Sequence, residues 1–223
     1  MDLESLSNPE TSSVPSSLAR ALREQTRADH ARIEQVPAHS ALLEARLTPS
    51  VYLAQLYLYR TLLLALESAA CTGPPFGRLS RLLTRDRRRA QLADQDTSEL
   101  ESLGVFPAPC VREPILSLAA RIRAAGPDDP ESIGAAYVME GASLGARIQE
   151  RLARQSMPQL QLAHRFFAGY GNDTGRMWRS FIERLDELPL REGECEAVVR
   201  GARSTFGALH TSFASIEMPS PVR

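Results

Sequence analysis

His30 lies beside a row of arginines on a segment whose residue pattern predicts an amphipathic helix. At about 100° per residue, this helix has an apolar face and an adjacent arginine stripe, made of Leu18, Leu22, Thr26 and Ile33 and of Arg20, Arg23 and Arg27. His30 falls on the border between the two. A ligand bound there would meet an apolar wall, one imidazole and several guanidinium groups. Such a site suits a flat apolar macrocycle that carries carboxylates, because apolar area drives binding and arginine forks position the acids.

Haem has that shape and charge, and Glu34 adds a second feature that fits it. Glu34 follows His30 by one helical turn, so its carboxylate could accept a hydrogen bond from the imidazole nitrogen that does not bind iron. The commoner situation for such a pair is a half-buried histidine with a surface glutamate, and spacing alone favours that situation. Asp29 points toward the apolar face, and the helix pattern does not explain it.

Three glycines lie inside a second predicted helix, in the segment IGAAYVMEGASLGARIQERL. They are Gly134, Gly141 and Gly145, and the last two lie one turn apart on one face. Each interior glycine costs about 1 kcal/mol of helix stability relative to alanine, so close approach of something to the backbone is the natural reason for them. Either another helix crosses at Gly141, Ala142, Gly145 and Ala146, or a ligand lies against the bare backbone. Without further information the helix crossing is favoured.

The elements that carry these residues are predicted to be helices. The chain contains 30 Leu but only 9 Val and 7 Ile, and unbranched apolar residues favour helices whereas strands favour β-branched ones. Capping residues and prolines predict helical segments over about 18–36, 49–70, 77–92, 114–125, 130–155, 159–170, 174–188 and 193–216. We therefore predict an all-α single domain over 16–217, with a disordered arm at 1–15 and a loose tail at 218–223.

Composition excludes several classes of protein. The 223 residues suffice for one core, and 26 basic against 27 acidic side chains argue against a nucleic-acid binder. No segment has the pattern of a secretory signal or the length of apolar sequence that spans a bilayer, so we expect a soluble, cytoplasmic protein without membrane contact. Cys71, Cys110 and Cys195 lie far apart, which argues against a zinc site or a disulfide framework.

A basic run, RLLTRDRRRA, contains Arg85, Arg87, Arg88 and Arg89. Such a run is most often a solvated helix face, and the docking of an acidic electron donor such as a ferredoxin is a further possibility. The histidines and carboxylates form no ExxH pair for a di-iron bundle. The chain also lacks a phosphate-binding glycine loop and a GxSxG nucleophile elbow.

A resemblance to the haem oxygenases is carried by two segments in order, LREQTRADHARIE and YVMEGASLGAR. A third segment, GYGNDTGRMWRSF, is similar to the bacterial, biliverdin-forming branch that serves phytochromes. The resemblance covers about residues 18–216. It implies an all-helical fold in which haem b lies between the first helix and a kinked distal helix.

The resemblance also implies roles for individual residues. His30 would be the axial iron ligand, Glu34 its orienting partner, and Gly141 and Gly145 the distal glycines that let the backbone pass close over the haem. Candidates for the contacts to the haem propionates are Arg23, Arg27 and Tyr137, with Arg176 and Arg179 as weaker ones. Phe206 and Phe213 match aromatic positions that wall the pocket, although both could equally be plain core residues.

By the same resemblance, haem would be both substrate and cofactor, cleaved with O2 and external electrons to biliverdin, carbon monoxide and iron. A ferredoxin or a flavoprotein reductase would supply the electrons, and a bacteriophytochrome would receive the biliverdin. The chain departs from many animal-type members at Ala142, where those proteins carry an aspartate beside the oxygen site. Two other classes stay open at this point, a non-catalytic haem carrier and a helical interaction module.

Overall fold

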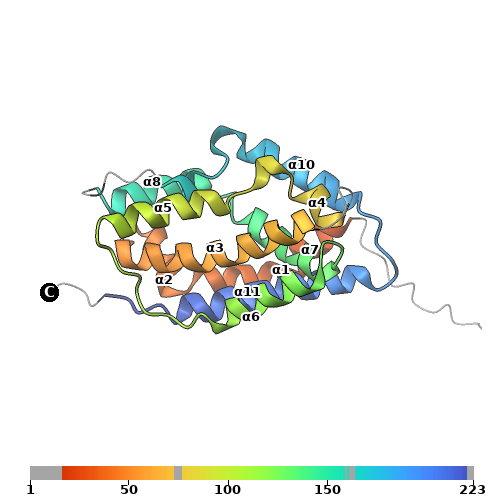
Figure 1. The fold of residues 1–223 in the computed structure, drawn as a ribbon, viewed down its shortest axis with the longest axis horizontal. Helices are drawn as coiled ribbons and strands as arrows, with labels where there is room; N and C mark the ends of the chain where they lie inside the picture. Colours follow the sequence, from red (N-terminus) through yellow and green to blue (C-terminus); the bar gives the residue numbers. More distant parts are fainter. Residues whose placement is uncertain (1–16, 73–76, 159, 161–163, 220–223) are drawn as a thin grey trace, which may run out of the picture.

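Helices are the regular structure of the chain throughout residues 17–72, 77–158, 160 and 164–219, which the computed structural model describes (Figure 1). In chain order the α-helices are α1 (Leu18–Glu34), α2 (Pro37–Leu43), α3 (Pro49–Thr72), α4 (Arg78–Leu82), α5 (Ala90–Ser102), α6 (Glu113–Ala125), α7 (Pro130–Gly141), α8 (Ala146–Ser156), α9 (Arg165–Ala168), α10 (Thr174–Asp186) and α11 (Glu194–Ala214). Two short 3-10 turns, η1 (Arg85–Arg87) and η2 (Gly171–Asp173), complete the order. The predicted all-α fold is confirmed.

Two of the helices begin at the caps that the sequence predicts. Ser17 accepts a hydrogen bond from the backbone N–H of Arg20 at 3.1 Å and starts α1. Asp129 accepts one from the N–H of Ser132 at 2.8 Å and starts α7. Each cap satisfies a backbone donor that the first turn of a helix leaves without a partner.

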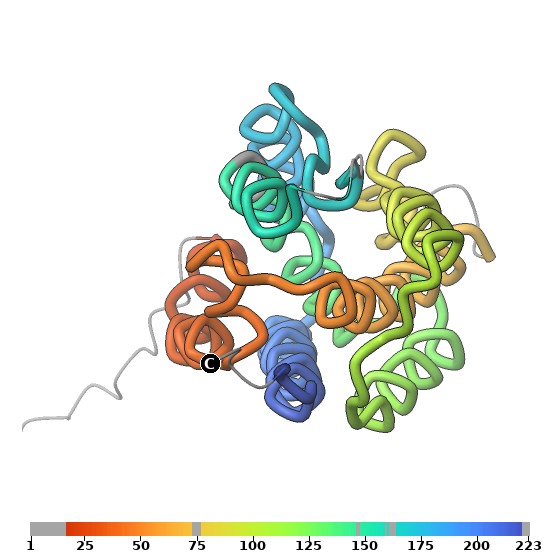
Figure 2. Tube along the Cα trace, turned by 90° about the vertical axis from the view of Figure 1, so that its left-hand side faces the viewer, coloured from red at the N-terminus to blue at the C-terminus, as the bar shows by residue number. Residues whose placement is uncertain are grey.

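Helix α3 forms the centre of the molecule. Figure 1 shows it running through the middle, with α5 on one side and α6 and α11 on the other. It is buried on most of its circumference, as expected of a helix that is apolar all round. Figure 2 shows α1 and α2 on one flank of α3 and α5 and α6 on the other, so the helices surround α3 rather than stack in one sheet-like layer.

Helices α7 and α11 cross in close contact at two glycines. A Cβ added at Gly134 would lie 2.0 Å from the carbonyl oxygen of Val198, and one added at Gly201 would lie 2.0 Å from that of Glu131. Real Cβ atoms do not come this close to backbone atoms. The crossing therefore requires glycine on both helices, and it accounts for Gly134 without a ligand.

Several predicted helix boundaries are wrong. The helix predicted over 159–170 lies partly outside the described residues, and inside them it is only the short α9 (Arg165–Ala168). The predicted helix over 77–92 is broken into α4, η1 and α5, because a carboxylate oxygen of Glu67 accepts hydrogen bonds from the backbone N–H groups of Arg89 and Ala90 at 2.8 and 2.9 Å and starts a new helix there. That helix, α5, continues to Ser102, ten residues beyond the predicted end. The sequence also did not predict α2, which begins at Pro37, where a helix was expected to end.

Some predictions fall outside the described residues. The predicted arm at 1–15 lies wholly outside them, and of the predicted tail at 218–223 only the first two residues lie inside. Among the described helices, none combines the length and the apolar character needed to cross a membrane.

Candidate functional site

His30 is exposed on the outer face of α1. Its side chain is 63% exposed, and Nδ1 lies 3.6 Å from Oε1 of Glu34. This separation brings the two groups together but exceeds a hydrogen-bond length. Among the described residues, no hydrogen bond or ion pair involves the Nε2 atom of His30. The imidazole therefore has one nitrogen beside a carboxylate and the other available to a ligand.

The two phenylalanines of α11 occupy different places. The ring of Phe206 meets the His30 ring edge to face, with centroids 6.0 Å apart. The ring of Phe213 instead packs against Tyr59 of α3, with centroids 5.2 Å apart, and Phe213 is almost fully buried. Phe206 thus lines the side of α11 that faces His30, and Phe213 belongs to the core between α3 and α11.

An ion pair ties α1 to α11 next to His30. Oδ2 of Asp29 lies 3.1 Å from Nε of Arg203. This contact explains why an aspartate points toward the apolar face of α1, which the helix pattern alone left unexplained. It also holds the backbone beside His30 against the helix that carries Phe206.

Tyr137 and Trp178 lie near the end of α7, and the charge of an arginine on α1 acts on the first of them. The charge of Arg23 acts on the phenol of Tyr137, whose pKa is raised by burial and partly lowered again by that arginine. The Tyr137 ring lies 5.7 Å from the ring of Trp178. A Cβ added at Gly141 would in turn lie 3.8 Å from the Trp178 ring. Tyr137 and Gly141 therefore both lie beside the Trp178 ring.

Gly141 and Gly145 are not required by helix packing. A Cβ at Gly141 would make only ordinary contact with Trp178, and one at Gly145 would meet the flexible side chain of Gln149 at 3.1 Å. The helix pattern breaks between them, since α7 ends at Gly141 and α8 begins at Ala146. The close crossing of α7 with α11 lies at Gly134, and the surroundings of Gly141 and Gly145 show no comparable approach of another backbone. Bare backbone at Gly141 and Gly145, and an imidazole on α1 with one nitrogen available, are features that suit a flat ligand such as haem.

Comparison with known families agrees with this geometry. A family model described as heme oxygenase matches residues 16–215. The chain belongs to the haem oxygenase family. It is a haem-degrading oxidoreductase.

Relatives of this haem oxygenase include a curated protein and several solved structures. A heme oxygenase from Xanthomonas campestris pv. campestris is 30% identical over 115 residues, which are 50% of this chain and 69% of that protein. The crystal structure of heme oxygenase-1 from the cyanobacterium Synechocystis sp. PCC6803 in complex with heme has a TM-score of 0.74 at 19% identity, and the match covers 88% of this chain and 90% of that one. The heme oxygenase from Leptospira interrogans has a TM-score of 0.76 at 18% identity, and its match covers 89% and 98%. These structures share the fold.

The remaining arginines that the sequence singled out lie on exposed surfaces. Arg27 is exposed on α1, and Arg20 of the predicted stripe pairs with Glu24 at 2.9 Å. Arg176 is exposed on α10 and pairs with Asp173 at 3.2 Å. Arg179 is exposed on the same helix, and its guanidinium lies near Gly175.

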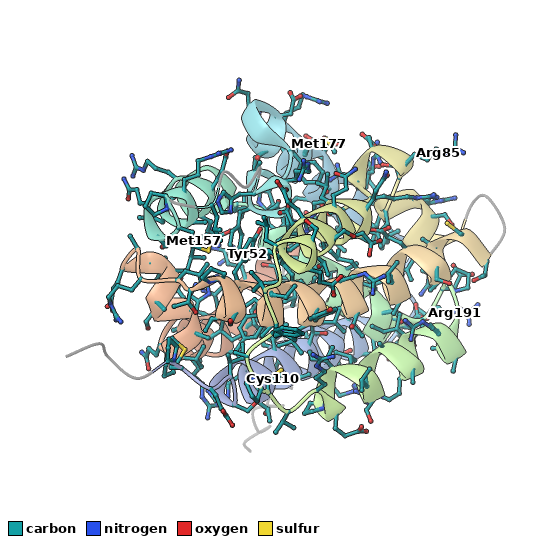
Figure 3. The ribbon with its side chains drawn as sticks, turned by 60° about the vertical axis from the view of Figure 1, so that its left-hand side comes forward. Tyr52, Arg85, Cys110, Met157, Met177 and Arg191 are labelled. Atoms are coloured by element: carbon teal, nitrogen blue, oxygen red, sulfur yellow. The ribbon has the colours of Figure 1, made fainter. Side chains whose placement is uncertain are left out.

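The basic run at 85–89 does not form a solvated helix face as predicted. Arg85 and Arg88 are exposed, and Figure 3 shows Arg85 pointing away from the body of the molecule. Arg87 and Arg89, in contrast, are each 2% exposed. The run forms the 3-10 turn η1 and the start of α5, and alternate arginines in it point into the core.

The buried arginines belong to a cluster that the sequence did not predict. Nη1 of Arg87 donates to Oε2 of Glu140 at 3.0 Å, and the hydroxyl of Tyr170 donates to Oε1 at 2.7 Å. Arg89 donates to the backbone carbonyl of Met139. The signal that could have revealed this cluster is Glu140, a charged residue within an otherwise apolar helical segment, because buried charges require partners.

Two shallow surface hollows lie away from this region. One is lined by Glu150, Arg151 and other residues of α8, and the second by residues of α5 together with Arg165. Neither includes His30, Gly141 or Gly145. The candidate site is therefore defined by the chemistry of its side chains and its bare backbone rather than by either of these hollows.

Proposed function

We propose that haem b binds between the exposed face of α1 and the kink between α7 and α8, and that it is cleaved there to biliverdin, carbon monoxide and iron. O2 and electrons from an external donor complete the reaction. The observation that carries this proposal is the pairing of an available imidazole at His30 with two glycines, Gly141 and Gly145, that no helix packing requires. Bound haem supplies the iron that activates O2 and the ring that is cut.

In this proposal His30 binds the iron through Nε2 in its neutral form. Glu34 lies 3.6 Å from the opposite nitrogen, and a small side-chain rotation would bring its carboxylate within hydrogen-bond distance. The carboxylate would then hold the proton on Nδ1 and set the direction of the ring. Asp29 supports this arrangement, because its ion pair with Arg203 holds the helix next to His30.

The propionates of haem would meet the arginine side of the site. Arg23 and Arg27 lie on the exposed face of α1, and Tyr137 offers a hydroxyl on which the charge of Arg23 acts. Guanidinium groups bind carboxylates with paired hydrogen bonds, so these residues would fix how the ring is turned in its plane. Arg176 and Arg179 of α10 are second candidates, and Arg176 would have to leave Asp173.

The apolar and backbone surfaces would hold the two faces of the ring. Phe206 would contact the porphyrin on the side of His30, and Phe213 would support that wall from the core. The backbone at Gly141 and Gly145 would lie over the opposite face and limit where O2 can bind. Because Ala142 offers no carboxylate, the protons for the reaction would travel through water and backbone carbonyl groups.

The partners of the reaction belong to the same proposal. A ferredoxin or a flavoprotein reductase would deliver the electrons, and exposed arginines such as Arg85 and Arg88 would suit an acidic donor. A bacteriophytochrome would receive the biliverdin. We place the reaction in the cytoplasm, because the three cysteines are free thiols, as is usual in a reducing compartment.

The test is an absorption spectrum of the purified protein with added hemin, recorded before and after addition of ascorbate or of ferredoxin with its reductase. We expect the Soret band of bound haem to decay into the broad red absorption of biliverdin. A stable Soret band under a competent reductant would instead indicate a haem carrier. If the Soret band does not shift, the protein does not bind haem, and His30 and the glycines have structural roles only.

The variant His30→Ala tests the ligand assignment. It should lower turnover by more than the roughly 10–100-fold that loss of a ligand's outer hydrogen-bond partner costs, and added imidazole should restore part of it. Gln25→Ala is the matched control, because Gln25 is exposed on the opposite face of α1 and should keep full turnover. Full activity of His30→Ala without imidazole would contradict the assignment.

A further inference from the structure

Glu140 is buried at the point where α7 ends. It directly precedes Gly141, and its side chain is 2% exposed. Arg87 donates to one carboxylate oxygen at 3.0 Å and Tyr170 to the other at 2.7 Å, while Arg89 lies 3.9 Å from the second oxygen. We call Arg87, Arg89, Glu140 and Tyr170 the Glu140 clamp. Its members come from η1, from the start of α5, from α7 and from the segment before η2.

The clamp connects the end of α7 to several other elements. Nη2 of Arg87 donates to the backbone carbonyl of Met177 on α10 at 2.8 Å. Arg89 donates to the carbonyl of Met139, and its guanidinium lies 5.5 Å from the centre of the Tyr170 ring. Two consecutive residues of α7, 139 and 140, are thus held from outside their own helix.

The segment that follows the clamp has little support of its own. Between Gly141 and Ala146 the regular helical hydrogen bonds are replaced by tight turns, in which Ser143 and Leu144 donate to the carbonyls of Glu140 and Gly141 at 3.0 Å. The hydroxyl of Ser143 also donates to the carbonyl of Glu140 at 2.7 Å. Two glycines make this backbone easy to bend, and the segment has one firmly held end, at Glu140.

The charges of the clamp give it stiffness. Arg87, Arg89 and Glu140 are all withdrawn from water, and Glu67 lies next to Arg89 and opposes the second positive charge. A buried charge that loses its partner is strongly destabilising, so the pair of Arg87 and Glu140 resists separation. Burial also raises the pKa of Tyr170 well above its usual value, which keeps the proton on its hydroxyl.

We propose that Arg87 and Tyr170 are positioning residues that hold Glu140, and through it the backbone from Gly141 to Gly145, at a fixed height over the haem. This inference rests on the proposed binding of haem at the kink. The clamp touches neither haem nor O2. It acts by limiting the positions that the bare backbone can take, and so it selects which meso carbon is exposed to attack.

Tyr170→Phe tests the clamp, because it removes one hydroxyl and keeps the ring beside Arg89. In the haem-free protein, amide hydrogen exchange over residues 140–148 should become about tenfold faster or more, as expected for the loss of a hydrogen bond to a charged group. The matched control is Tyr52→Phe. Tyr52 also donates to a buried carboxylate, that of Asp96 at 2.8 Å, and Figure 3 shows it in the interior away from Met177.

The control separates a local effect from a general loss of stability. Tyr52→Phe should leave exchange over residues 140–148 at the wild-type rate. Equal acceleration in both variants, or acceleration spread over the whole chain of Tyr170→Phe, would overturn the clamp.

The haem-loaded protein gives the second readout. With haem and reductant, Tyr170→Phe should yield a larger share of the minor biliverdin isomers than the wild type or Tyr52→Phe, as measured by chromatography. A loosened kink with an unchanged isomer ratio would overturn the positioning role. If the wild-type protein does not degrade haem, the proposed function fails, whereas wild-type turnover with no effect of Tyr170→Phe on either readout refutes the clamp alone.

Discussion

Helix α7 and the kink after it carry glycines whose surroundings are opposite. Gly134 lies where α7 crosses α11, and an added Cβ would come within 2.0 Å of the opposing backbone. Gly141 and Gly145 lie about two and three turns closer to the C-terminal end of the same segment, where an added Cβ would meet only a ring edge or a flexible glutamine. We call the first position the packed site and the other two the open site.

The difference shows that one residue type serves two purposes within about three helical turns. At the packed site glycine allows two helices to approach, and this approach stabilises the fold. At the open site no helix takes the space that glycine provides, so its cost in helix stability is not offset by packing within the chain. The open site is therefore the part of α7 that folding alone does not explain.

The largest effect should come from filling the packed site. Gly134→Ala places a methyl group against the Val198 carbonyl, so the two helices must separate, and overpacking of this kind should lower the free energy of unfolding by about 3 kcal/mol or more. Urea unfolding measures it. The matched control is Gly207→Ala on α11, which has open space around it and should lose nothing. If Gly134→Ala is as stable as the wild type, the crossing of α7 and α11 does not require glycine, and the two kinds of site do not differ as described.

Filling the open site should act on haem degradation rather than on folding. Gly145→Leu adds a side chain beside Gln149, which can move away, so the free energy of unfolding of the haem-free protein should change by no more than about 1 kcal/mol. Turnover of haem should fall, or the biliverdin isomers should change. Gly145→Ala should show a smaller effect of the same kind. If Gly145→Leu degrades haem at the wild-type rate to the wild-type product, the open site has no role in the reaction.

A smaller and opposite effect on stability is expected at Gly141. The residue is helical, and a methyl group there would make ordinary contact with Trp178. Gly141→Ala should therefore raise the free energy of unfolding of the haem-free protein by up to about 1 kcal/mol, since alanine favours helix and restricts the unfolded chain. Thermal unfolding measures the change. A marked loss of stability would mean that Gly141 is needed for packing after all.

The smallest effect is the pH dependence of the free energy of unfolding that a buried histidine causes. His164 is 1% exposed, and burial, aided by the charge of Arg154, lowers its pKa below the usual 6.5. The unfolded chain then binds more protons than the folded chain as the pH falls below about 6.5, so the free energy of unfolding decreases from pH 7.5 to 5.5. His164→Asn, which suits the left-handed backbone there (φ 48°), should flatten this slope in urea unfolding.

A second, half-buried histidine limits the size of this effect. His39 also has its pKa lowered by burial, so His164→Asn should reduce the slope rather than remove it. A wild-type slope in the His164→Asn protein would contradict the assignment.

Local sequence patterns predicted most helices correctly, because caps and apolar periodicity act within a few residues. Ser17 and Asp129 start α1 and α7 as expected. The prediction of one helix over 77–92 was wrong for a long-range reason. Glu67 of α3 accepts the backbone hydrogen bonds that start α5. No pattern within the segment itself contains that information.

The candidate site divides in the same way. The spacing of His30 and Glu34, and the glycines of the distal segment, were visible in the chain because a helix places residues one turn apart on one face. The role of Asp29 as a partner of Arg203, and the burial of Arg87 and Arg89, were not visible. These contacts join residues that are 50 to 174 positions apart.

The sequence by itself determined the helical class, the helix that carries His30 and the family to which the chain belongs. It did so because propensity, capping and motif spacing are properties of neighbouring residues. Only the tertiary structure decided which glycine serves packing and which remains open, and which arginines of the basic run turn inward to hold Glu140. Those outcomes depend on how distant helices cross, since the space around a backbone atom and the partner of a buried charge are both set by other parts of the chain.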